Sequence, residues 1–220
     1  VGKSVALKAL IGFLVVYFAL VFFFVGVSLS DILREYFPGE EPIRVVNRYL
    51  SLWFLAGIFM RFMLQNLPVL HVKPLLVQQI KKSALVHFVL GKSVLHWINF
   101  LSPLLFIPFA VVTLETSVYS GTQVSGWAAM MVGMIFVLNF LNFILQKQFA
   151  DNLKVLLPFL LVVSVLGALE YFEVFALSPY LRQAFDAVLA QPYLAVIPFV
   201  LAIFLYRLNF IHLKKQLYLD

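Results

Sequence analysis

Residues 5–28 read VALKALIGFLVVYFALVFFFVGVS, and this stretch decides the class of the fold. A helix needs about 20 consecutive apolar residues to cross the hydrocarbon core of a bilayer, and Lys8 is the single charged residue in this run. The run is too long for the core of a cleaved signal peptide, and no small-residue cleavage site is evident. We therefore predict that residues 5–28 form a transmembrane helix.

Five further apolar runs follow, near 45–67, 93–114, 127–146, 155–172 and 192–210. Phe, Leu and Val dominate them, without the alternation that is typical of a transmembrane barrel strand. Of the 220 residues, 63% are hydrophobic and 12% are charged, whereas soluble proteins carry about 25% charged residues. The surplus apolar surface must face lipid. We expect an all-α, polytopic bundle of six spans that forms a single transmembrane domain over residues 1–220.

The charged residues are divided unequally between the two sides of this predicted bundle. Eleven of the sixteen basic residues fall on the side that holds both chain ends, and eight of the ten acidic residues fall on the other side. Because basic residues stay cytoplasmic, both termini are predicted to be cytoplasmic. Trp127, Tyr171 and Tyr193 are expected at the outer membrane interface, where aromatic rings are favoured. In a chain this apolar, we interpret the net charge of +6 as basic residues retained on the cytoplasmic side. Nucleic acid is therefore not an expected partner.

The connection before the last run contains a predicted amphipathic helix. Ser178 can cap a helix, and Pro179 suits the first helical position. One face of this helix is apolar and the other is polar. The apolar residues are Leu181, Phe185, Val188 and Leu189. We expect a short external helix that lies on the outer leaflet or dips into it.

The connection before the third run is a basic stretch. Residues 68–92 read PVLHVKPLLVQQIKKSALVHFVLGK, with four lysines and two histidines. Residues 75–80 can form a short apolar-faced turn that ends at Lys81 and Lys82, and Ser83 can cap a helix that continues over 84–112. Such a helix would be longer than about 40 Å, more than a hydrocarbon core of about 30 Å accommodates. We expect it to protrude, tilt or kink at 91–93, Pro103 or Pro108.

The sequence contains no recognisable catalytic or ligand-binding motif. Gly-Lys-Ser occurs at 2–4 and 91–93, but the second copy has Val86 where a phosphate-binding loop needs glycine. The four histidines include no i, i+4 pair and no HExxH arrangement, and no nucleophile elbow is present. We therefore expect neither an enzyme nor a cofactor or metal site on this chain.

Polar side chains inside the predicted spans are few. The candidates are Arg61, Gln65, Asn139 and Asn142. Intramembrane charge is costly and commonly faces a bundle interior or a cavity, which would make Arg61 functional. The structural alternative, which we favour, is that Arg61 snorkels to the cytoplasmic interface and that the asparagines bond between helices. No acidic residue lies near the centre of a span, which argues against proton or sodium coupling.

Residues 75–92, LLVQQIKKSALVHFVLGK, resemble a segment of type-2 ABC exporter permeases. In that family a Leu-rich turn, a Pro-Ile-Ser-Arg-like tetrapeptide and a downstream Gly-Lys precede the third span. The six runs, both predicted cytoplasmic ends and the amphipathic helix before the last span match the family layout. The chain looks like the N-terminal half of a longer bacterial permease-like protein. It departs from the pattern in lacking a helix before the first span and in having Gln where proline is common.

The resemblance implies a coupling helix that contacts a cytoplasmic ATPase. The implied ATPase-docking residues are Gln78, Gln79, Ile80, Lys81, Lys82 and Ser83. The chain would then be the membrane subunit, or half of one, of an ATP-driven exporter in the bacterial inner membrane, with ATP on a partner subunit. The other partners would be a second permease half or a homodimer mate, and the lipid bilayer. The alternatives are a non-transporting scaffold or assembly protein and half of a secondary transporter, with an intramembrane enzyme last.

Overall fold

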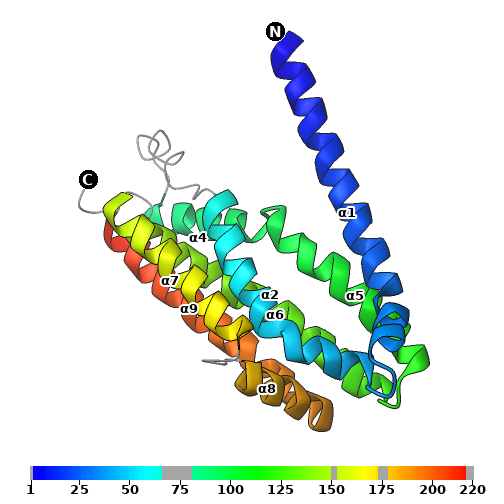
Figure 1. Ribbon diagram of the computed structural model, residues 1–220. Coiled ribbons are helices and arrows are strands. Elements are labelled where there is room, and N and C mark those ends of the chain that lie inside the picture. The colour runs from blue at the N-terminus through cyan, green and yellow to red at the C-terminus, as the bar shows by residue number, and fades with distance from the viewer. Residues whose placement is uncertain (1, 66–80, 150–152, 173–177, 217–220) are drawn as a thin grey trace.

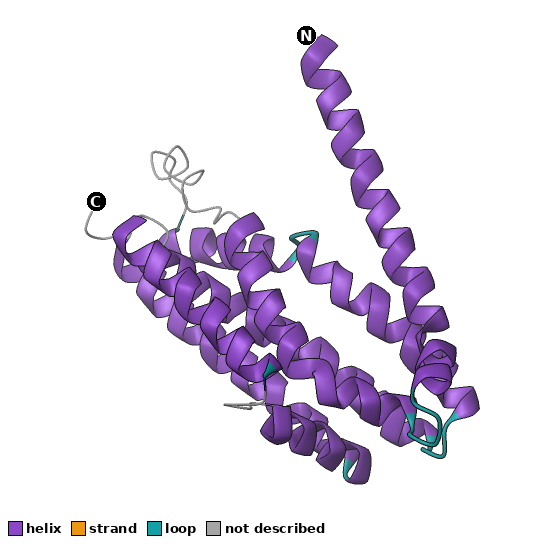
Figure 2. Cartoon of the chain, in the orientation of Figure 1, coloured by secondary structure: helices purple, strands orange, loops and turns teal. Residues whose placement is uncertain are grey.

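The computed structural model describes residues 2–65, 81–149, 153–172 and 178–216, and within these ranges the chain forms helices and no strands (Figures 1 and 2). The elements, in chain order, are α1 (Gly2–Tyr36), α2 (Pro42–Leu64), α4 (Lys82–Val94), α5 (Ile98–Thr116), α6 (Gly121–Phe149), α7 (Leu153–Tyr171), α8 (Ser178–Ala190), the 3-10 helix η2 (Pro192–Ala195) and α9 (Val196–Gln216). The predicted all-α fold is confirmed.

Five described helices are long and apolar enough to cross a membrane. These candidate spans lie in α1, α2, α5, α6 and the η2–α9 pair. The remaining predicted run, 155–172, corresponds to α7. The composition and these helices together indicate a membrane protein. The count of six spans and the side on which the termini lie remain predictions.

The two ends of the bundle hold different elements (Figure 1). The start of α1, the end of α2, α4 and the end of α9 lie toward one end, which we call the α4 end. The α1–α2 and α5–α6 connections and α8 lie toward the other, which we call the α8 end. In the sequence, Lys81, Lys82, Lys214 and Lys215 belong to the first group of elements, and Asp186 belongs to the second.

The α1–α2 connection is short and has clear local causes. Helix α1 continues beyond the predicted end at residue 28 to Tyr36. Pro38 disfavours a helical conformation in the residue before it, and Gly39 has a φ of 90°, which favours glycine. Helix α2 then begins at Pro42, where the missing N–H costs nothing.

The long helix predicted over 84–112 is wrong. The chain forms two helices, α4 and α5, that are separated at residues 95–97. None of the expected kink points is the break, since Gly91 lies within α4 and both Pro103 and Pro108 lie within α5. Ser83 is not the helix cap either, because α4 begins at Lys82 and the capping position is Lys81, with no side-chain bond.

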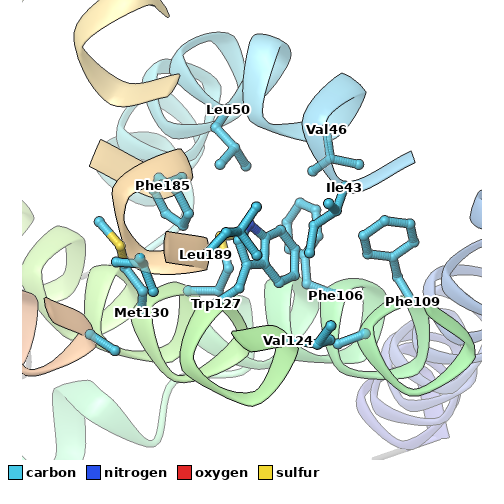
Figure 3. Close-up of a cluster of buried hydrophobic side chains, with 14 of the residues drawn as sticks. Ile43, Val46, Leu50, Phe106, Phe109, Val124, Trp127, Met130, Phe185 and Leu189 are labelled. Carbon is cyan, nitrogen blue, oxygen red and sulfur yellow. The ribbon is translucent and has the colours of Figure 1, made fainter. Parts of the chain in front are cut away.

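The core lies toward the α8 end and is centred on Trp127 of α6 (Figure 3). Its neighbours come from α2, α5, α6 and α8. Those labelled in the figure are Ile43, Val46, Leu50, Phe106, Phe109, Val124, Met130, Phe185 and Leu189. The prediction that Trp127 lies at the membrane interface is wrong, because the side chain is 0% exposed. Its indole Nε1 donates to Asn47 Oδ1 at 2.7 Å, so the polar atom is satisfied inside the bundle. Tyr171 and Tyr193 are exposed.

The predicted amphipathic helix is confirmed as α8, although Ser178, expected to cap the helix, is its first helical residue. Its apolar face, however, packs on protein instead of lying open to lipid. Phe185, Val188 and Leu189 are buried in the core against α2 and α6. The reason is tertiary: α8 packs against the first half of α2 and covers Trp127.

Helix α1 contacts the bundle through its second half and diverges from it at its start (Figure 1). It packs chiefly on α5, and a Cβ atom at Gly26 would lie 2.2 Å from the carbonyl oxygen of Leu105. Toward the start of the helix, large apolar side chains such as Phe13 and Val16 are exposed. One half of α1 is therefore packed on protein and the other half is open.

Candidate functional site

A buried polar network lies toward the α4 end and joins four helical segments. It contains all four intramembrane polar residues that the sequence singled out, Arg61 and Gln65 near the end of α2 and Asn139 and Asn142 on α6. It also contains Ser93 of α4, Asn99 of α5 and Gln146 of α6. Each of these side chains is less than a tenth exposed. The predicted bonding of the asparagines between helices is confirmed.

The network replaces the helical hydrogen bonds that are lost at the α4–α5 break. The carbonyl oxygen of Ser93 accepts from Gln65 Nε2 at 3.1 Å and from Asn99 Nδ2 at 3.0 Å. The carbonyl oxygen of Val94 accepts from Asn99 Nδ2 at 3.1 Å. Backbone that leaves a helix inside a membrane protein needs such partners, because no water is present to supply them. The break is therefore stabilised by side chains from α2 and α5.

Asn139 is the hub of the network. Its Oδ1 accepts from Gln65 Nε2 at 2.8 Å and from Asn99 Nδ2 at 3.0 Å. Its Nδ2 donates to Ser93 Oγ at 3.1 Å. A single amide on α6 thus connects α2, α4 and α5, and displacement of any of these helices must change its bonds.

The end of α2 is held by α6. Gln146 Nε2 donates to the carbonyl oxygens of Arg61 at 3.2 Å and Phe62 at 3.0 Å, and also to that of Gln65. Asn142 Nδ2 donates to Gln65 Oε1 at 3.3 Å. The last carbonyls of a helix have no partner within the helix, so these side chains satisfy what would be an unpaired, buried end.

The prediction that Arg61 snorkels to the cytoplasmic interface is wrong, because its side chain is 2% exposed inside the bundle. Its Nε donates to Asn99 Oδ1 at 3.1 Å, and its Nη1 donates to the carbonyl oxygen of Gly57 at 3.2 Å. Glycine leaves room for the guanidinium, because a Cβ atom at residue 57 would lie 3.0 Å from Nη1. Within the described ranges, Nη2 has no acceptor and no carboxylate forms an ion pair with Arg61.

Two cavities border this network. The larger, of about 310 Å³, lies between α5 and α6 at the α4–α5 break. Its walls are apolar, except where Asn99 and Asn139 reach them. The smaller, of about 60 Å³, lies between α1, α2 and α5, and its lining includes Phe22, Trp53, Arg61 and Ser102.

The implied ATPase-docking residues are only partly described. Gln78, Gln79 and Ile80 lie outside the described residues. Lys81 is exposed, and Lys82 and Ser83 are half-buried at the start of α4. The apolar face of α4 is occupied by the bundle, where Leu85, Val86, Val89 and Leu90 pack with Phe143 and Leu213.

Sequence reasoning missed three members of the network. Gln146 continues the face set by Asn139 and Asn142, at the i, i+3, i+7 spacing of a helix, and this signal could have revealed it. Ser93 and Asn99 carry no such signal, because their proximity depends on the break at 95–97. In the described part of the chain, no group of three or more His, Asp and Glu side chains could hold a metal ion.

No curated protein and no solved structure matches this chain. One family model matches residues 1–220, and its description is a family of unknown function, DUF5687. The chain belongs to this family of unknown function, DUF5687.

Proposed function

We propose that this chain is the membrane-spanning permease subunit, or half of one, of an ATP-driven exporter in the bacterial inner membrane. A separate cytoplasmic ATPase docks on the segment 68–92 and supplies the energy. The observation that carries the proposal is the α4–α5 break, where α4, the helix at the end of this segment, is bonded to the transmembrane bundle through buried side chains.

The break connects a cytoplasmic event to the membrane. Helix α4 begins at Lys82, within the proposed docking residues, and packs on α9 and α6. A push on its start changes the bonds that Ser93 makes with Gln65, Asn99 and Asn139. Coupling between sites requires an element with alternative arrangements, and a helix break held by side-chain bonds is such an element.

The open half of α1 supports a partner in the membrane. Its apolar side chains lie outside the bundle, and α1 diverges from α2 toward the α4 end (Figure 1). A second permease half, or a second copy of this chain, would pack against α1 while α1 and α2 move relative to it. The remaining exposed apolar surface faces lipid.

Copurification with the ATPase tests the proposal. The tagged chain is expressed in its native bacterium and purified in mild detergent, and a bound ATPase subunit is identified by mass spectrometry and by ATP hydrolysis. The double substitution Lys81→Glu with Lys82→Glu places negative charge at the start of α4. We expect it to reduce the ATPase bound at least tenfold while the chain still inserts and folds.

A matched control distinguishes docking from general attraction to anionic lipid. Lys214 and Lys215 form a second lysine pair at the end of α9, also with one exposed and one half-buried side chain. Lys214→Glu with Lys215→Glu changes the net charge equally and should retain the ATPase. Failure of the unmodified chain to bind an ATPase, or equal loss with both lysine pairs, would contradict the proposal.

A further inference from the structure

We infer that Arg61 and the small cavity beside it form a binding site for the headgroup of an anionic amphiphile that enters sideways between α1 and α2. The ligand class is a single-chain lipid with a compact acidic group, either a carboxylate or a phosphate. The inference goes beyond the exporter proposal, because binding at this site requires no ATPase.

The cation in this site is held in place by two hydrogen bonds, and one of its nitrogens has no acceptor among the described residues. Arg61 is fixed by Asn99 and Gly57, which leaves Nη2 without an acceptor among the described residues. Burying a charge without a full set of partners inside a membrane protein is costly. Arg presents a planar set of donors that suits carboxylate and phosphate oxygens. An anionic ligand would supply the missing acceptor and offset that cost.

A second donor faces the same cavity. Ser102 Oγ accepts from Trp53 Nε1 at 3.2 Å, and both side chains contribute to the lining. Since the serine oxygen is used as an acceptor in this bond, its O–H can donate to a ligand. A bound acidic group would thus receive hydrogen bonds from Arg61 on one side and from Ser102 on the other.

The size and walls of the cavity limit the ligand. The volume of about 60 Å³ is small beside the 310 Å³ of the cavity at the α4–α5 break, which favours a compact acidic group. The remaining lining is largely apolar and includes Phe22, Ala56, Met60 and Leu101. Ala56 and Met60 are exposed, so the cavity borders the membrane-facing surface of α2. An acyl chain can lie along this surface while the headgroup occupies the cavity.

The position of Arg61 along α2 suits a headgroup. It lies three residues before Leu64, the last residue of the helix, which is about 5 Å at 1.5 Å per residue. The start of α1 diverges from α2 toward that end (Figure 1). A lipid from the adjacent leaflet therefore needs to insert its headgroup by only about one helical turn.

Photo-crosslinking in neutral nanodiscs tests the site. The whole chain is reconstituted in phosphatidylcholine and exposed to a palmitate analogue that carries a diazirine near its carboxylate. We expect labelling of α1, α2 and α5 residues around Arg61, displaced by excess palmitate or lysophosphatidic acid but not by hexadecanol. Displacement by palmitate alone assigns the site to carboxylates, and displacement by lysophosphatidic acid alone assigns it to phosphates.

Substitutions of Arg61 and Ala56 test whether the label binds at this site. Arg61→Met should lower labelling at least tenfold, and Arg48→Met, a control on the same helix, should leave it unchanged. Ala56→Phe should block the cavity from its exposed side without removing a buried group, and should also abolish labelling. Equal displacement by hexadecanol, or normal labelling in Arg61→Met or in Ala56→Phe, would refute the site.

Discussion

The α8 end and the α4 end of the bundle bury their side chains in different ways. At the α8 end, aromatic and aliphatic side chains surround Trp127, and the one polar atom of its indole has a partner in Asn47. Toward the α4 end, buried amides and a guanidinium lie beside a smaller apolar cluster of α4, α6 and α9, and Arg61 Nη2 and Asn142 Oδ1 have no partner in the described part of the chain. The first region is packed mainly by apolar side chains, and the second adds a buried hydrogen-bond network to a smaller apolar core.

The two ends are expected to differ in how easily their helices move. Any change of shape in a closely packed interior lowers its stability, so the α8 end resists movement. Hydrogen bonds between membrane helices average about 0.6 kcal/mol and can be exchanged for others. The α4 end can therefore change its arrangement at low cost, while the α8 end keeps the helices together. Four substitutions test this comparison.

Trp127→Ala should have the largest effect. Removing a buried tryptophan from a packed core costs about 3–5 kcal/mol, and Asn47 Oδ1 would lose its donor. The free energy of unfolding in detergent, measured by chemical denaturation, should fall by that amount. Trp97→Ala is the control, because Trp97 is 38% exposed and its loss should cost less than about 1 kcal/mol. Similar losses in the two variants would mean that the α8 end is not the anchor.

Gly26→Ala tests the close approach of α1 to α5. The added methyl group would meet the carbonyl oxygen of Leu105, so α1 must shift, and overpacking of this kind costs about 1–3 kcal/mol. Thermal unfolding should show the loss. Gly12→Ala on the same helix meets no atom within 4 Å and should leave stability unchanged. If both glycines tolerate alanine, α1 is not packed on α5 as described.

Asn139→Leu tests the hub of the polar network. It removes three hydrogen bonds at about 0.6 kcal/mol each, so stability should fall by about 2 kcal/mol. Amide hydrogen exchange should increase in α4 and at the break but not in α8. Asn142→Leu removes a single 3.3 Å bond to Gln65 and is the matched control, with a smaller effect. Equal exchange in α4 and α8 would argue against a separate, movable α4 end.

Arg61→Met should have the smallest effect on stability, and in the opposite direction. It removes an unpaired buried charge at the cost of two hydrogen bonds, with a net gain of about 1 kcal/mol in the free energy of unfolding. Arg48→Met loses an exposed ion pair with Glu40 and should cost less than about 1 kcal/mol. A large loss of stability in Arg61→Met would show that the guanidinium serves the fold.

Periodicity and charge predicted the elements well but not where they break. The apolar runs account for α1, α2, α5, α6, α7 and α9, and Ser178 with Pro179 predicted α8 from local signals alone. The α4–α5 break could not be read from sequence. Gly91, Pro103 and Pro108 are the residues that favour kinks, yet the helix breaks at 95–97, where the side chains of Gln65 and Asn99 supply the missing partners.

The candidate site was predicted as separate residues and not as a site. Arg61, Gln65, Asn139 and Asn142 were recognised because polar side chains are rare in apolar runs. Their assembly with Ser93 and Asn99 depends on contacts between residues 28 to 77 positions apart in the chain, which no local pattern encodes. Arg61 was expected at an interface because the sequence does not show that Asn99 and Gly57 hold it inside.

The sequence by itself determined that this is a helical membrane protein with most of its basic residues in one group of segments. Lipid solvation requires long apolar helices, and the helical period then follows from backbone hydrogen bonding. Tertiary structure alone decided which side chains are buried. The packing of α8 over Trp127 made a predicted interfacial residue into the centre of the core. The meeting of α2, α5 and α6 left Arg61 buried beside a cavity, with one nitrogen that has no acceptor among the described residues.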